Sequence, residues 1–351
     1  MRRRIGAFLL SGILTVSMFA GCGSQPSTNN LSNTTSNEGS SEEKTTKNTE
    51  TEKTPQEEDH FTIKYPSYMT DSEGDALELE KEPEKIVCLS NAALQILVRC
   101  DIKPIAITST ASGIDYPDWV EELPTIETGM SEVDTESIIA LEPDLVIMGE
   151  HLKEDYGKLL DDADIPVYYS SEGPSTTYEE VKEAAVVFGE AFGGEEEKAA
   201  IEAEFKEVED RANEYAQNHD TKKMMILFSL SPAYQQTSEG YLGSMLSLLP
   251  FENLSDSLID PSERTAPLDM EKLVEMNPEV IFAISPMAQT SEDVEKMFQA
   301  EFDANPQIWN NLDAVKNGKI IYLPNEYVKS KGMYIINSLN TLMDMLEETL
   351  Q

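Results

Sequence analysis

Residues 136–147 read Glu-Ser-Ile-Ile-Ala-Leu-Glu-Pro-Asp-Leu-Val-Ile, and residues 271–282 read Glu-Lys-Leu-Val-Glu-Met-Asn-Pro-Glu-Val-Ile-Phe. Each stretch combines a short amphipathic helix, a proline that ends it, an acidic residue and a continuous apolar run. Such a run is typical of a strand that is buried on both faces of a parallel sheet. Because the unit occurs twice, far apart in the chain, we expect two lobes of one architecture. A cleft between two such lobes is where small ligands bind.

The rest of the folded chain fits around these two units. Apolar runs at 86–89, about 104–108, 145–149 and 166–169 alternate with helical stretches, which is the βαβ pattern of a first lobe at 61–175. Residues 176–219 have a helical pattern, broken at Gly193-Gly194, and are predicted to connect the lobes. A second lobe at 220–351 has predicted strands at 224–230 and 320–323 and a terminal helix at 333–350. The predicted fold class is therefore α/β, with two Rossmann-like lobes joined by one long connecting α-helix.

The N-terminal 60 residues carry a different signal. Arg2, Arg3 and Arg4 precede an apolar segment that ends at Phe19-Ala20-Gly21-Cys22, which resembles the lipobox of bacterial lipoproteins. We therefore expect residues 1–22 to be a signal peptide with lipidated Cys22; the alternative is an ordinary secretory signal cut nearby. Residues 23–60 are almost devoid of apolar side chains and are predicted to be a disordered tether. Together these features predict a protein anchored by a lipid at the extracellular face of the cell membrane.

Charge and composition exclude several functions. The formal net charge of −40 argues against nucleic acid and polyanionic ligands. Three scattered histidines and two remaining cysteines supply neither a metal cluster nor a nucleophile with its base. A metal-dependent enzyme on the same scaffold and a zinc or manganese receptor are thus disfavoured, and no catalytic cofactor is expected. Cys88 and Cys100 are interpreted either as a disulfide, which an exported protein permits, or as two buried thiols.

Several motifs together resemble a known family. They are the two repeats, Gly129-Met130 before the first of them, Pro83-Glu84-Lys85-Ile86-Val87, Thr237 to Gly243, Glu292 to Phe302, Trp309 and Ala314 to Gly318. From about residue 83 onwards the chain resembles substrate-binding proteins of ABC importers that carry ferric siderophores, haem or cobalamin. It is most similar to the haem-receptor lipoproteins of Gram-positive bacteria. The resemblance implies a monomeric receptor, not an enzyme, that captures an iron complex, with haem favoured, and delivers it to a permease.

The resemblance also implies candidate haem ligands. In the haem receptors a methionine from lobe one and a histidine from lobe two hold the iron; Met130 stands at the methionine position. At the histidine position the chain reads Ser285-Pro286-Met287-Ala288, so Met287 becomes the candidate second axial ligand. Both methionines also fit ordinary packing roles.

Other candidates follow from position, because loops at the carboxyl ends of parallel strands face the ligand crevice. His151 follows the strand at 145–149 and is either an iron ligand or a solvated loop residue. Ser90 and Asn91 follow the first strand and are either ligand contacts or a helix cap. Two exposed-loop aromatic residues, Tyr234 and Tyr327, are expected either to stack on a macrocycle or to bind ferric iron. Two lysines, Lys329 and Lys331, are expected to pair with ligand carboxylates such as haem propionates.

Glu136 and Glu271 occupy the same offset before Pro143 and Pro278. In the family that the chain resembles, one surface glutamate from each lobe docks onto arginines of the permease. The resemblance therefore implies that Glu136 and Glu271 bind the permease, whereas a glutamate on a helix face is otherwise an ordinary solvated charge.

Overall fold

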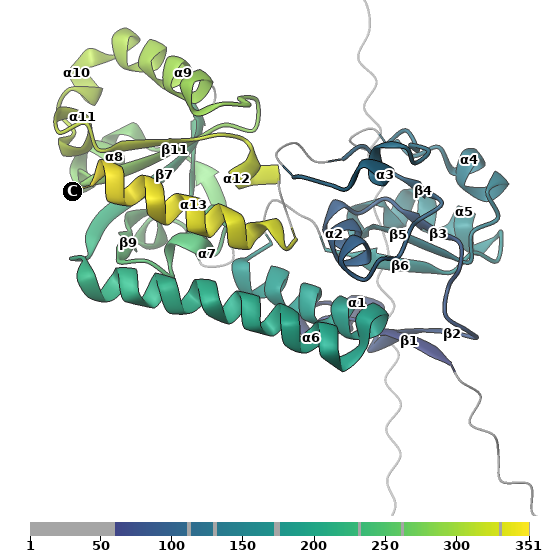
Figure 1. Cartoon of the computed structure of the whole chain (residues 1–351). Helices are drawn as coiled ribbons and strands as arrows, with labels where there is room; N and C mark the ends of the chain where they lie inside the picture. Colours follow the sequence, from purple (N-terminus) through teal and green to yellow (C-terminus); the bar gives the residue numbers. More distant parts are fainter. Residues whose placement is uncertain are drawn as a thin grey trace, which may run out of the picture. The chain divides into compact units, whose positions relative to one another are not determined.

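The structure is a computed structural model that describes residues 60–110, 114–128, 132–171, 176–230, 233–260, 263–329 and 332–350 (Figure 1). The predicted signal peptide, Cys22 and almost all of the predicted tether lie outside the described residues, as do Met130 and Lys331. The described residues all belong to one compact unit. Within the described residues, no helix has the length and apolarity that a membrane span requires.

The first lobe is built on four parallel strands in the order β4–β3–β5–β6. They are β3 (Ile86–Cys88), β4 (Ala106–Ile107), β5 (Leu145–Gly149) and β6 (Val167–Ser170), so the four predicted strands are confirmed. Every residue of β5 is buried, because the strand has neighbours on both sides and packing on both faces. The helices of this lobe are α2 (Asn91–Arg99), α3 (Asp118–Glu121), α4 (Thr135–Ala140) and α5 (Lys158–Asp161).

The second lobe has a six-stranded mixed sheet in the order β10–β8–β7–β11–β12, with β9 beside β7. Strands β7 (Lys222–Leu230), β9 (Phe251–Asn253), β11 (Val280–Ile284) and β12 (Ile320–Leu323) run parallel. The antiparallel strands β8 (Ala233–Gln236) and β10 (Thr265–Pro267) extend one edge and were not predicted from the sequence. The helices are α7 (Tyr241–Leu246), α8 (Met270–Met276), α9 (Ser291–Ala304), α10 (Pro306–Trp309), α11 (Asp313–Lys316), α12 (Glu326–Lys329) and α13 (Tyr334–Thr349) (Figure 1).

The two repeated sequence units fold alike. Helices α4 and α8 begin after Asp134 and Asp269, whose carboxylates accept hydrogen bonds from amides of the first turn. Both helices are followed by a residue in the left-handed conformation, Glu142 with φ of 49° and Asn277 with φ of 46°. A proline comes next in each unit, and it prevents the helix from continuing.

The acidic residue after each proline anchors the following strand. Asp144 accepts a hydrogen bond of 2.8 Å from the amide of Lys85, at the start of the neighbouring strand β3. Glu279 accepts one of 2.9 Å from the amide of Lys223, in the neighbouring strand β7. The repeat therefore specifies a helix, a stop and a central strand in each lobe.

The connector is helix α6 (Tyr178–Asn218), which is 41 residues long and begins with a capping box at Thr177 and Glu180. It is not straight, because Gly194 has φ of 68° and ψ of −167°, a conformation that is essentially restricted to glycine. The predicted break at Gly193-Gly194 is thus confirmed.

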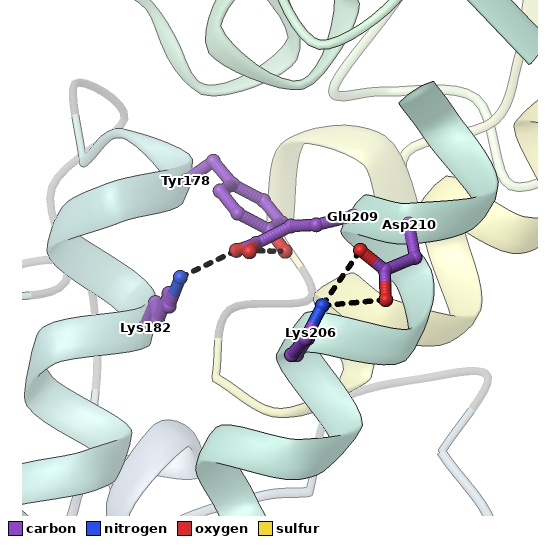
Figure 2. Close-up of polar contacts among 5 residues, drawn as sticks. All are labelled: Tyr178, Lys182, Lys206, Glu209 and Asp210. Carbon is purple, nitrogen blue, oxygen red and sulfur yellow. Dashed lines mark hydrogen bonds and ion pairs between the residues drawn. The ribbon is translucent and has the colours of Figure 1, made fainter. Parts of the chain in front are cut away.

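Contacts between its two halves show that α6 folds back on itself as a helical hairpin. Glu209, in the second arm, accepts hydrogen bonds from the hydroxyl of Tyr178 at 3.3 Å and from Nζ of Lys182 at 2.5 Å, both in the first arm (Figure 2). Near the turn, Lys198 pairs with Glu190 at 3.3 Å. The helix packs against β1 and α2, which precede it in the chain, and against α7 and α13 of the second lobe. One continuous apolar core includes Ile86 of the first lobe, Phe205 of the connector and Ile226 of the second lobe.

A short N-terminal element precedes the first lobe. Strands β1 (Phe61–Lys64) and β2 (Ala76–Leu79) form an antiparallel hairpin, with helix α1 (Thr70–Glu73) between them. Tyr65 stacks on Tyr168 of β6 with ring centroids 4.6 Å apart, and Lys64 pairs with Glu190 of α6. The hairpin therefore fixes the beginning of the folded chain to the connector.

Cys88 and Cys100 are both thiols, so the disulfide is not present in the structure. Cys88 is buried in β3, whereas Cys100 is only partly buried at the end of α2. Of the two predicted alternatives, the pair of thiols holds, with one of them less buried than expected.

Candidate ligand-binding site

The carboxyl ends of the lobe-one strands meet at one edge, as parallel strands require. The side-chain amide of Asn91, the first residue of α2, donates a 3.1 Å hydrogen bond to the carbonyl of Ser109, which follows β4. Ser90 is fully buried and its hydroxyl accepts a 3.0 Å hydrogen bond from the amide of Ala93. Ser90 thus acts as the helix cap of α2 in this structure, while Asn91 is half-buried at the carboxyl edge of the sheet.

The corresponding edge of lobe two presents Met287. This residue follows β11, and 82% of its surface is exposed. Its position is fixed locally, because Ser285 is buried and its hydroxyl accepts a 3.3 Å hydrogen bond from the amide of Met287. The amide of Asn325, after β12, donates to the carbonyl of Ala288 at 2.9 Å, which joins the two strand ends. An exposed thioether is therefore held at the carboxyl edge of the sheet.

His151 lies at the carboxyl end of β5, as predicted, in a short 3-10 turn formed by Glu150–Leu152. It is exposed, and its imidazole covers the backbone of Gly149, where a Cβ atom would lie 2.5 Å from the ring. His60 and His219 are exposed as well, and His219 stacks on Tyr215 at 4.0 Å.

The prediction that Tyr327 is an exposed loop aromatic is wrong. The residue lies on α12 with 1% of its surface exposed, and its hydroxyl donates a 3.3 Å hydrogen bond to the carbonyl of Ser338 on α13. Burial raises the pKa of Tyr327. Tyr234 is half-buried in β8 rather than in a loop, opposite Phe228 of β7. Lys329 ends α12, and Lys331 lies outside the described residues.

The two lobes contact each other next to these strand ends. The amide of Tyr334, at the start of α13, donates a 2.8 Å hydrogen bond to the side-chain carbonyl of Gln95 on α2. Gly332, with φ of 84°, approaches α2 so closely that a Cβ atom there would lie 2.8 Å from Cα of Ala92. A larger side chain at residue 332 would therefore force the lobes apart.

Beside this contact lies a groove of about 440 Å³, which is within the range of small-molecule sites. Its walls are α2 and residues 114–116 of lobe one, the start of α13, and α6. Burial, followed by the carboxylates of Glu326 and Asp115, raises the pKa of Tyr334 in this groove. The polar residues that line it were not predicted from the sequence, because they come from two lobes and the connector and share no motif. They are Gln95, Arg99, Asp115, Tyr116, Glu204, Tyr334 and Asn337.

The arginine that lines the groove is held in ion pairs. Arg99 pairs with Glu197 at 2.7 Å and with Glu204 at 2.9 Å, which fixes its guanidinium against the connector. Among the described residues, no cluster of three or more histidine, cysteine, aspartate or glutamate side chains is arranged to hold a metal ion. A bare cation therefore has no evident site in the part of the chain that the structure describes.

Glu136 and Glu271 occupy equivalent places in the two lobes. Each is an exposed residue in the first turn of its helix, α4 or α8. In the described part of the chain neither carboxylate belongs to an ion pair, although Lys272 beside Glu271 pairs with Glu275.

Comparison with known proteins agrees with this architecture. The model of the periplasmic binding protein family matches residues 86–327, which includes both sheets and the connector. The chain belongs to this family. Its members are substrate-binding proteins rather than enzymes, as the sequence analysis predicts.

Individual relatives share little sequence identity with this chain. A cobalamin-binding protein of Halobacterium salinarum (strain R1) is 18% identical over 285 residues, which cover 81% of this chain and 75% of the relative. An ABC transporter substrate-binding protein from Listeria monocytogenes EGD-e is 24% identical, with a TM-score of 0.63 over 76% of this chain and 98% of that structure. Staphylococcus aureus IsdE complexed with heme is 20% identical, with a TM-score of 0.61 over 76% of this chain and 99% of that structure. These likenesses confirm the predicted fold class.

Proposed function

We propose that this protein is the receptor of an ABC importer for an iron complex, with haem as the favoured ligand. It is held at the extracellular face of the cell membrane by a lipid on Cys22 and a polar tether. Ligand captured between the lobes is delivered to a permease that docks on Glu136 and Glu271. Ferric siderophore and cobalamin are the alternatives within the same family.

The observation that carries the choice of ligand is Met287. Methionine is normally used as a packing residue, yet here 82% of its surface is exposed at the end of a central strand. A thioether is an established axial ligand of haem iron, and the apolar side chain also suits the face of a macrocycle. His151 is the nitrogen ligand available from lobe one, since it is exposed at the end of β5. The haem complex of IsdE and the cobalamin-binding relative support a tetrapyrrole ligand for this fold.

The test is a titration of the purified full-length protein with hemin, followed by absorbance in the Soret region. We expect a saturable spectral shift with one hemin per chain. Replacing the exposed thioether (Met287→Ala) should change the spectrum and weaken binding by about tenfold, which is the loss expected for one coordinate bond or one well-packed side chain. Met297→Ala is the matched control, because Met297 is also exposed but lies on α9.

Two outcomes would contradict the haem assignment. The first is a titration with no saturable shift, in which case quenching of the fluorescence of Trp119 and Trp309 by ferric siderophores or cobalamin tests the alternatives. The second is equal binding by the Met287→Ala, His151→Ala and Met130→Ala variants and the Met297→Ala control, which would remove all three candidate ligands from the site.

A further inference from the structure

An exposed apolar side chain lies one helical turn after each of the two predicted docking glutamates. Ile139 follows Glu136 on α4, and Val274 follows Glu271 on α8. Their exposed fractions are nearly equal, 38% for Ile139 and 41% for Val274. Residues three positions apart on a helix lie on the same face, so each carboxylate and its apolar neighbour form one patch.

The repetition extends to the residue directly before each exposed apolar side chain. Ile138 and Leu273, directly before the exposed residues, are completely buried. Both helices therefore pack one apolar side chain into the core and leave the next one in solvent. Five large apolar side chains are exposed among the described residues, and this single repeat position accounts for two of them; the others are Leu159, Met287 and Met297. A chance exposure would not be expected to recur at the same position in both lobes.

The two carboxylates are also available to an outside cation, although the charge of Lys272 lies close to Glu271. Within the described residues no lysine or arginine pairs with Glu136 or Glu271, and the formal net charge of the chain is −40. A carboxylate next to an apolar side chain is complemented by a surface that places a cation beside an apolar pocket.

We propose that Glu136 with Ile139, and Glu271 with Val274, form two equivalent composite docking contacts for the ABC permease. This inference rests on the proposed function. The permease would present an arginine or lysine beside an apolar pocket. It would present that surface twice, on two identical or closely similar subunits, because the two contacts on this chain are alike.

The two halves of each contact have different physical roles. The carboxylates act over a distance, so they increase the association rate in a manner that salt screens. The β-branched side chains act only after contact, when they leave water, so they slow dissociation and respond little to salt. The rate constants and their salt dependence therefore separate the contributions.

The test measures binding of the full-length protein, in detergent, to the ABC permease of the source cells reconstituted in nanodiscs, at several salt concentrations. Ile139→Ser and Val274→Ser should each raise Kd by about five- to tenfold through faster dissociation, as expected when an apolar contact of this size is removed. The slope of log Kd against log salt should not change. Met297→Ser is the control, because it also replaces an exposed apolar side chain by serine but on a different surface, α9. This variant should bind the permease with the same Kd as the native chain. Glu136→Gln and Glu271→Gln should instead reduce the salt dependence of association.

The outcomes distinguish this inference from the proposed function. Unchanged Kd in both serine variants, with weakened binding in the glutamine variants, would contradict the composite contact and leave glutamate docking intact. Unchanged binding in all four variants would contradict docking through these helices altogether. A lowered melting temperature or hemin affinity in the serine variants, repeated in Ile139→Thr and Val274→Thr, would assign the side chains to folding and would also overturn the inference.

Discussion

At the scale of single residues, position in the sequence predicts location better than it predicts exposure. His151 lies at the end of β5, as the order of strands and loops predicts, and Met287, a candidate from the family resemblance, follows β11. Tyr327 also follows a strand, but the short helix α12 turns its ring into the core, where its hydroxyl finds the carbonyl of Ser338. The burial of Tyr327 cannot be predicted from the sequence alone, because it depends on how α13 packs against α12. The groove between the lobes has the same origin, since Gln95 and Tyr334 meet from opposite lobes.

The two thiols differ in their expected reactivity. Burial, followed by the charge of Glu197, raises the pKa of Cys100 to about 11. Because only the thiolate reacts, alkylation of Cys100 by iodoacetamide at pH 8 should be roughly two hundredfold slower than that of an ordinary thiol with a pKa of about 8.5. Its rate should continue to rise with pH beyond 9 and level off only above pH 11. Peptide mapping by mass spectrometry distinguishes Cys100 from Cys88.

Two controls make this measurement decisive. Cys88 is completely buried and should remain unmodified in the folded protein. In guanidinium chloride both thiols should react at similar, ordinary rates. Fast alkylation of Cys100 in the folded protein at pH 8 would contradict the burial of its thiol.

At the scale of elements, the repeat was the most reliable part of the sequence. It predicted α4 with β5 and α8 with β11, because a capped amphipathic helix, a proline and a fully apolar run leave few alternatives. Strands β8, β9 and β10 were missed because Gln235 and Gln236 interrupt the apolar pattern of β8, and because β9 and β10 have only three residues each. The glycine pair predicted the break in α6 but not the direction in which the second arm leaves it. That direction is set by the contacts of Glu209 with Tyr178 and Lys182 in the first arm.

The turn of α6 provides a stability prediction. Gly194 has a backbone conformation that other residues strongly disfavour, while a Cβ atom there would meet nothing within 4 Å. Gly194→Ala should therefore lower the free energy of unfolding by about 1–3 kcal/mol through backbone strain alone. Denaturant unfolding measures this value. Glu196→Ala, an exposed change on the same helix, should stay within about 0.5 kcal/mol of the native chain. An equal effect of both substitutions would mean that the turn is not fixed at Gly194.

At the scale of the whole folded unit, the connector and the direct contact between lobes limit motion. One core cluster continues from lobe one through α6 into lobe two, and Gln95 bonds to Tyr334 across the interface. A packed helical hairpin resists bending more than a pair of extended strands would. Small-angle scattering should therefore give nearly equal radii of gyration for the protein without ligand and with hemin. A large compaction on hemin addition would contradict this prediction.

The measurement that tests the central proposal most directly is uptake of radioiron-labelled hemin by cells whose only receptor is the Glu136→Arg/Glu271→Arg variant. Both side chains are exposed, so the substitutions should leave the melting temperature and the hemin affinity of the purified protein nearly unchanged. Two charge reversals should nevertheless abolish uptake, because they repel the cations that are expected on the permease. Cells with the native chain should take up hemin normally. Normal uptake through the double variant, or loss of hemin binding by it, would contradict the proposal that ligand is held between the lobes and delivered through these two glutamates.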